Sequence, residues 1–113
     1  MFGGDCLSKN LLICDLLELY GELLTEKQLK LLELYYFDDL SLSEIAENEG
    51  GSRQGAMDVI KRAEKELLKM ESILGLYNRN LEQTKIIGDL KSAIQNNDSL
   101  KIKSLISELE KTI

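Results

Sequence analysis

The chain has 113 residues, of which 43% are apolar and 30% are charged, and its formal net charge is −6. This composition is typical of one globular domain, or of one domain with a helical appendage, and excludes a disordered chain. No apolar run approaches the roughly 18 residues of a membrane span, and the first residues lack the pattern of a secretory signal. We therefore expect a cytoplasmic protein.

Helical signals dominate the first half of the chain. Proline is absent, and leucines spaced by three and four predict a helix over residues 7–24. Capping boxes, in which a Ser or Thr and a Glu or Gln three residues later exchange hydrogen bonds, mark the next two helix starts. Thr25 and Gln28 form the first box, and the helix that follows it ends at about Tyr36. Ser41 and Glu44 form the second box, which precedes a helix over residues 42–49.

The second half predicts three more helices. Ser52 can cap a long helix that reaches about Leu74 and ends at Gly75. The inward positions of that helix are Ala56, Ile60, Ala63, Leu67, Met70 and Leu74. Two helices then follow, with apolar positions Leu81, Ile87, Leu90 and Ile94 in the first, and Ile102, Leu105, Ile106, Leu109 and Ile113 in the second, which Ser99 can cap.

These elements predict an all-α protein in two parts. Residues 1–75 form a helix-turn-helix domain with a long reading helix, and residues 76–113 form a C-terminal helical extension. No segment shows the strict alternation of a half-buried strand. The last two helices have strong apolar faces, so we expect them to pack on the first domain or on a second copy in a homodimer.

The residue types do not favour an enzyme. The chain has no histidine to act as a base, and Gly50-Gly51-Ser52 lacks the lysine that follows in a phosphate-binding loop. Cys6 and Cys14 are expected to be buried thiols on one helix, too far apart to bridge. Two cysteines without histidine make a poor zinc site, so we expect no catalytic residue, metal or cofactor.

The charges are distributed unevenly along the chain. Residues 1–50 carry three basic and eleven acidic side chains, whereas residues 51–70 carry five basic and three acidic ones. The chain therefore lacks a global field that attracts polyanions, and any binding of nucleic acid must be local and sensitive to salt.

Residues 41–62 have the spacing of a helix-turn-helix. Ala46 is the small residue where two helices cross, Gly50 accepts a left-handed backbone, and Ser52 begins the reading helix. With Ala56 and Ile60 inward, polar side chains face outward and suit base edges or phosphates. The candidate nucleic-acid-binding residues are Ser52, Arg53, Gln54, Met57, Asp58, Lys61, Arg62 and Lys65.

The stretch SLSEIAENEGGSRQGAMDVIKRAEKEL resembles the last helix-turn-helix of sigma factors of the extracytoplasmic-function kind. With LYGELLTEKQLKLLELYYFDDL before it, the chain resembles the YlxM family of small bacterial helix-turn-helix proteins over roughly residues 16–77. That family is encoded beside genes of the signal recognition particle. The resemblance implies a regulatory or accessory role in that pathway, through the particle's RNA or its GTPase.

The chain departs from the family pattern Gly-Val-Ser-Arg-Gln-Ala-Val-Tyr at positions 50–57. Gly51 and Ala56 stand where the family has valine, and Gly55 stands where it has alanine. Removing two methyl groups at an inward site lowers the stability of the fold by about 1–2 kcal/mol. We therefore expect the turn to be less tightly packed than in the family pattern.

Two uses of this geometry stay open. In the first, the chain is a regulator that binds RNA or DNA through residues 52–65. In the second, it is a protein-interaction module of the signal recognition particle pathway that contacts the GTPase, and the helix-turn-helix is only a scaffold. Asp58 within the reading face counts against the first, since a carboxylate repels phosphates. A DNA-binding transcriptional regulator is a further alternative.

Overall fold

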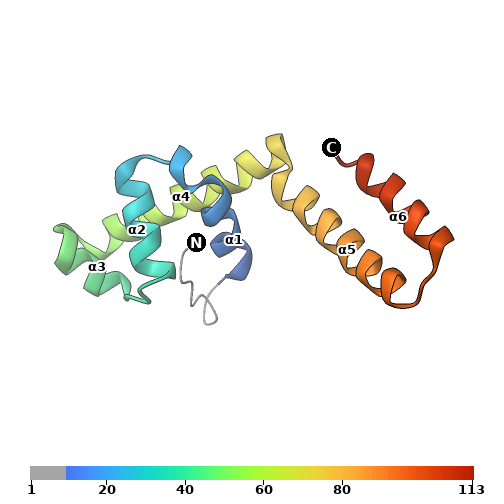
Figure 1. Ribbon diagram of the computed structural model, residues 1–113. Helices are drawn as coiled ribbons and strands as arrows, with labels where there is room; N and C mark the ends of the chain where they lie inside the picture. Colours follow the sequence, from blue (N-terminus) through green and yellow to red (C-terminus); the bar gives the residue numbers. More distant parts are fainter. Residues whose placement is uncertain (1–9) are drawn as a thin grey trace. The chain divides into compact units, whose positions relative to one another are not determined.

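The computed structural model describes residues 10–113, and every regular element in that range is a helix (Figure 1). The all-α class predicted from the sequence is confirmed. The chain forms two compact units, the first ending at Leu74 and the second beginning at Gly75. The first unit contains α1 (Leu11–Tyr20), the 3-10 turn η1 (Gly21–Leu23), α2 (Glu26–Tyr36), α3 (Leu42–Glu49) and α4 (Arg53–Leu74), and the second contains α5 (Leu76–Gln95) and α6 (Ser99–Glu110).

Helices α2 and α3 begin at the predicted capping boxes. The Thr25 hydroxyl accepts the Gln28 N–H at 3.2 Å, and the Gln28 side chain accepts the Thr25 N–H at 3.2 Å. Ser41 and Glu44 exchange the same pair of hydrogen bonds at 3.1 and 2.9 Å. Each box satisfies two backbone donors that a helix start leaves without partners.

The first helix differs from its prediction. Helix α1 begins at Leu11 because the side chain of Asn10 accepts the N–H groups of Leu12 and Ile13, and it ends at Tyr20, where η1 follows. The predicted helix over 7–24 is therefore too long, and residues 7–9 lie outside the described residues. Cys14 is buried and disulfide-bonded, so the expectation of unbridged thiols on one helix is wrong; Cys6 lies outside the described range.

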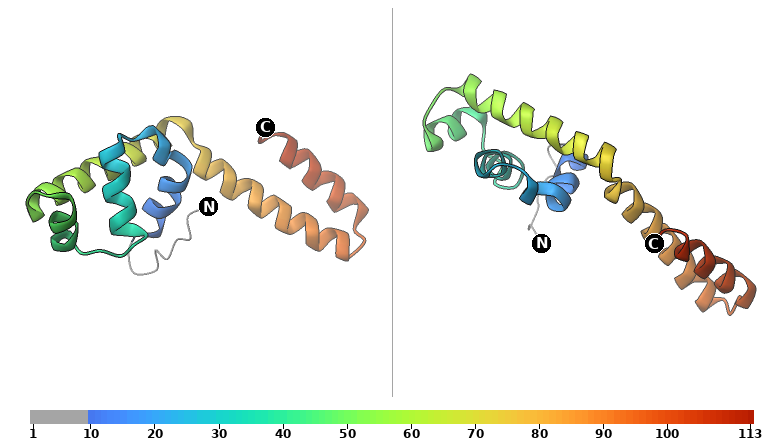
Figure 2. Two further views of the ribbon diagram at one scale, coloured as in Figure 1. Left: turned by 60° about the vertical axis from the view of Figure 1, so that its left-hand side comes forward. Right: turned by 90° about the horizontal axis from the view of Figure 1, so that it is seen from above.

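The core of the first unit lies where α1, α2 and α3 pack against α4 (Figure 2). The view from above in Figure 2 shows the three shorter helices on one side of α4. The predicted inward residues Ala56, Ile60, Ala63 and Leu67 are buried, and Met70 is half-buried. Leu74 is 52% exposed, so its predicted inward placement is wrong. The most deeply buried large side chains are Leu16, Leu17, Tyr20, Leu32, Ile45 and Leu67.

Two buried tyrosines tie the shorter helices to α4. The Tyr20 hydroxyl donates to Glu71 Oε1 at 2.6 Å, and the Tyr36 hydroxyl donates to Glu64 Oε2. The two glutamates are seven residues apart, about two helical turns, so they lie on the same side of α4. These bonds fix the position of α4 against α1 and α2 through two side chains that lie in the core.

Replacing Tyr36 with phenylalanine is expected to lower the free energy of unfolding by about 1.5–3 kcal/mol at neutral pH, the usual value of a hydrogen bond to a charged group. Two effects raise the pKa of Tyr36 above its ordinary value. Burial of the hydroxyl is the larger one, and the hydrogen bond to Glu64 is the next. The neutral hydroxyl therefore stabilises the fold fully below the unfolded pKa of about 10, and this contribution disappears as the pH rises further. Denaturant titrations above pH 10 should show a smaller drop in stability in Tyr36→Phe than in the parent; equal drops would contradict the assignment.

In the second unit, α5 and α6 pack together as a helical hairpin. Its buried residues are Ile86, Ala93 and Leu105, and Leu90, Ile102 and Leu109 pack against them. The sequence predicted Ile87 and Ile94 on the apolar side of α5, but they are 43% and 55% exposed. The buried side of α5 is therefore rotated relative to the predicted one. The side chain of Asp98, and not that of Ser99, caps α6 by accepting the Lys101 N–H at 3.2 Å.

Candidate nucleic-acid interface

The predicted helix-turn-helix consists of α3, a short turn and α4. The turn bends through two consecutive glycines, Gly50 and Gly51, with φ angles of 78° and 113°. Side-chain-bearing residues rarely adopt such angles. The Ser52 hydroxyl then accepts the Gly55 N–H at 2.9 Å, which begins α4 as predicted. The turn therefore presents the start of α4 at the surface, where Ser52, Arg53 and Gln54 are all exposed.

The structure separates the two positions at which the chain lacks the valines of the family pattern. A Cβ atom added at Gly51 would meet nothing within 4 Å. Its positive φ angle is one that glycine adopts without strain. Gly51 and Ala56 both line a pocket of about 120 Å³ between α2, α3 and α4, but only Ala56 is buried. The missing valine therefore leaves unfilled space at Ala56, whereas at Gly51 the backbone angle favours glycine.

Valine is expected to have opposite effects at these two positions. Ala56→Val adds two methyl groups beside the pocket and should raise the free energy of unfolding by up to about 1 kcal/mol. Gly51→Val forces a branched side chain into a left-handed backbone and should lower it by about 1–3 kcal/mol. Urea midpoints of both variants measure the difference. A stabilised Gly51→Val would contradict this expectation, because packing in the pocket would then outweigh the backbone strain.

A basic groove runs along the exposed side of α4. It is lined by Asp58, Lys61, Arg62 and Lys65 and has a volume of about 320 Å³. All four residues are exposed, and their spacing by three, one and three places them on one side of the helix. Three cations and one carboxylate at this spacing can contact successive phosphates of a nucleic-acid backbone.

The remaining predicted residues lie nearer the start of α4. Gln54 donates to Asp58 Oδ1 at 3.0 Å, so the amide and the carboxylate hold each other on the exposed face. Met57 is half-buried. Arg53 lies apart from the basic groove, in a separate depression that includes Asp39 and Glu44. The structure therefore brings Asp58, Lys61, Arg62 and Lys65 together and places Arg53 in more acidic surroundings.

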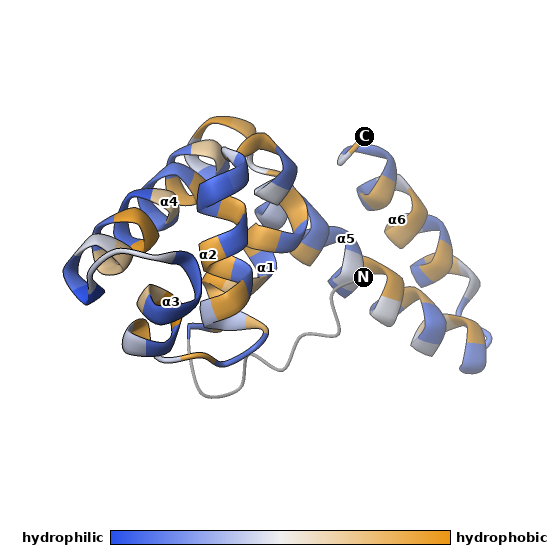
Figure 3. Ribbon diagram, turned by 90° about the vertical axis from the view of Figure 1, so that its left-hand side faces the viewer, coloured by the Kyte–Doolittle hydropathy of each residue, from blue (hydrophilic) through white to orange (hydrophobic). Residues whose placement is uncertain are grey.

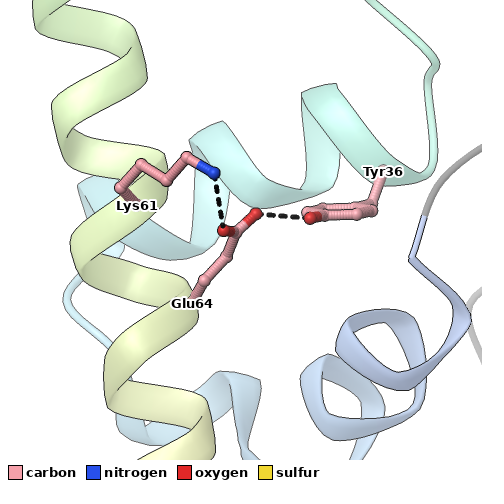
Figure 4. Close-up of polar contacts among 3 residues, drawn as sticks. All are labelled: Tyr36, Lys61 and Glu64. Carbon is pink, nitrogen blue, oxygen red and sulfur yellow. Dashed lines mark hydrogen bonds and ion pairs between the residues drawn. The ribbon is translucent and has the colours of Figure 1, made fainter.

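Lys61 is connected to the core through Glu64 (Figure 4). Its ammonium nitrogen lies 3.8 Å from Glu64 Oε1, and the other carboxylate oxygen of Glu64 accepts the Tyr36 hydroxyl. The carboxylate is thus held in place by the core and reduces the positive charge that Lys61 presents to a ligand. Arg62 and Lys65 should therefore contribute more to phosphate binding than Lys61.

Three further residues lie near the groove, and the sequence pattern did not single them out as candidates for binding. Thr25 and Gln28 join Arg62 and Lys65 in lining a neighbouring depression of about 390 Å³. Their residue types indicate only a capping box, and their approach to α4 depends on helix packing. Lys69 is exposed and lies four residues after Lys65. This spacing, visible in the sequence, places it on the same side of α4.

Comparison with known proteins identifies the family. A sequence model described as "Putative helix-turn-helix protein, YlxM / p13 like" (UPF0122) matches residues 7–107. The chain belongs to this family. A UPF0122 protein of Clostridium acetobutylicum is 48% identical over 105 residues, covering 87% of this chain and 88% of the relative. Relatives in Streptococcus agalactiae and Acetivibrio thermocellus are 42% and 40% identical, and each alignment covers at least 84% of both chains.

The YlxM resemblance inferred from the residues is thus confirmed. The family description names a helix-turn-helix and no reaction, so UPF0122 is not described as an enzyme family. Within residues 10–113, no helix combines the length and the apolar character needed to cross a membrane.

Proposed function

We propose that this UPF0122 protein binds nucleic acid through the exposed side of α4 and acts as a regulatory or accessory factor. The observation that carries the proposal is the groove in which Lys61, Arg62 and Lys65 lie together. The residues up to Leu74 carry eight basic and fifteen acidic side chains. A cluster of cations in so acidic a unit makes a local site for phosphates. This site lies on α4, the second helix of the helix-turn-helix.

The resemblance to the YlxM family extends this proposal to the signal recognition particle. The particle's RNA is then the first nucleic acid to test, and the protein would assist or regulate the pathway by binding it. Duplex DNA is the alternative, as for a transcriptional regulator with a sigma-like helix-turn-helix. The groove favours neither, because its cations reach phosphates, which RNA and DNA share.

Fluorescence anisotropy with labelled particle RNA and labelled duplex DNA, over a series of salt concentrations, tests the proposal. We expect binding at low salt that weakens linearly on a log–log plot, with a slope that reports the number of phosphates contacted. A parent protein that binds neither probe at low salt would refute the proposal. Preference for one probe at the same salt concentration identifies the class of nucleic acid.

A second candidate is a protein-interaction module that contacts the particle's GTPase without nucleic acid. Two carboxylates favour it, because Asp58 lies within the groove and Glu64 pairs with Lys61. The strongly acidic first unit also suits a basic protein surface. Calorimetry with the purified GTPase in the absence of RNA separates the candidates. Binding to the GTPase without binding to either nucleic acid would favour this second function.

A further inference from the structure

The hairpin of α5 and α6 leaves one apolar face exposed. Ile87 and Ile94 on α5 are 43% and 55% exposed, and Ile106 and Ile113, on α6 and just after it, are 45% and 94% exposed. Ile87 and Ile94 are seven residues apart within α5, or two helical turns, so they lie on one side of that helix. Figure 3 shows apolar residues recurring along both helices.

The three isoleucines that lie within the helices share one side of the hairpin. Ile87, Ile94 and Ile106 each follow a buried residue directly, which places them about 100° around the helix from the buried seam. Because α5 and α6 run in opposite directions (Figure 1), the same rotation on both helices leads to the same side of the hairpin. The half-buried Leu90, Ile102 and Leu109 extend the apolar surface towards the seam. We call the surface formed by Ile87, Ile94 and Ile106 the isoleucine face.

The size of this unit indicates that the isoleucine face is covered. Residues 75–113 bury only Ile86, Ala93 and Leu105. Units below about 40 residues are usually stabilised by disulfides, metals or association. This hairpin contains no cysteine, and no group of side chains in the described part of the chain could hold a metal ion. The face can then be covered by the first unit of the same chain or by a second copy, which are the two alternatives that the sequence left open.

A second copy of the same hairpin fits the isoleucine face. Residues 75–113 carry six basic and five acidic side chains, so two copies can approach with little repulsion. The outer borders of the face carry opposite charges at equivalent positions. Lys91 lies four residues after Ile87 in α5, and Glu110 lies four residues after Ile106 in α6. This arrangement suits pairing of α5 in one copy with α6 in the other.

We propose that two chains associate through their isoleucine faces and form a four-helix bundle from two α5–α6 hairpins. Each helix of such a bundle needs two adjacent apolar seams, one towards its hairpin partner and one towards the second hairpin. Both α5 and α6 have them. The assembly would carry two helix-turn-helix units and would form without nucleic acid, so this proposal is independent of the proposed function.

The test is the mass of the full chain in solution, measured by light scattering after size exclusion without nucleic acid. The chain mass is 12.8 kDa, and the parent is expected at twice that value. The double variant Ile87→Glu, Ile106→Glu should run at the mass of one chain. The matched control Leu81→Glu, Leu100→Glu changes residues on the same helices that are 52% and 82% exposed but lie outside the isoleucine face, and it should stay dimeric.

Circular dichroism checks that all variants keep their helices. A parent that runs as one chain over a wide range of concentrations would overturn the proposal. So would a control that dissociates as fully as the double variant, because the effect would then come from added charge and not from the isoleucine face.

Discussion

Replacing Lys61, Arg62 and Lys65 together with alanine is expected to weaken binding to nucleic acid about a hundredfold at low salt. The three cations line one groove on α4, and removing a cation that neutralises one phosphate lowers the salt slope by about 0.9 for duplex DNA. The slope should therefore fall by about 2 to 3. The weakening is expected to be uniform across sequences, because interactions with phosphates carry no sequence information.

A control with the same change in net charge separates the groove from a general effect. Lys85, Lys101 and Lys111 are exposed and lie in the second unit, and their replacement with alanine should leave the salt slope unchanged. Among single variants, Arg62→Ala and Lys65→Ala should weaken binding more than Lys61→Ala, since Glu64 already pairs with Lys61. Equal weakening in the triple variant and in the control would show that binding depends only on net charge.

The second large effect concerns the core of the first unit. Leu67 in α4 is completely buried, and its replacement with alanine is expected to lower the free energy of unfolding by about 3 kcal/mol. This destabilisation combines the transfer free energy of the removed methyl groups with the cost of the cavity that remains. Because small domains are stable by only about 5–15 kcal/mol, such a change should shift the urea midpoint clearly.

The next residue provides a matched control. Leu68 is the neighbour of Leu67 in α4 and can also be replaced with alanine, but its side chain is 45% exposed. Leu68→Ala should cost less than about 1 kcal/mol, since it leaves no enclosed cavity. Urea titrations followed by circular dichroism compare the two variants. Similar destabilisation in both would mean that α4 packs against the first unit in a different rotation.

Some features of the interface were readable from short segments of sequence. The spacing of Asp58, Arg62 and Lys65 predicted that they lie on the same side of α4, because side chains three and four residues apart are neighbours on a helix. The separation of Arg53 from this group was not predictable. Its surroundings come from Asp39 and Glu44, which lie before α4 in the chain and approach Arg53 only after α3 has packed.

The sequence by itself determined the helical class, the family and the starts of α2, α3 and α4. The caps at Thr25, Ser41 and Ser52 join groups three residues apart, so local residue types are sufficient to specify them. Only the tertiary structure decided which side of α5 is buried, that the Tyr36 hydroxyl donates to Glu64, and that Gly51 and Ala56 line one pocket in which only Ala56 is buried. The physical reason is distance along the chain. Tyr36 and Glu64 are 28 residues apart, and such interactions depend on how whole helices rotate and pack, which a local pattern does not specify.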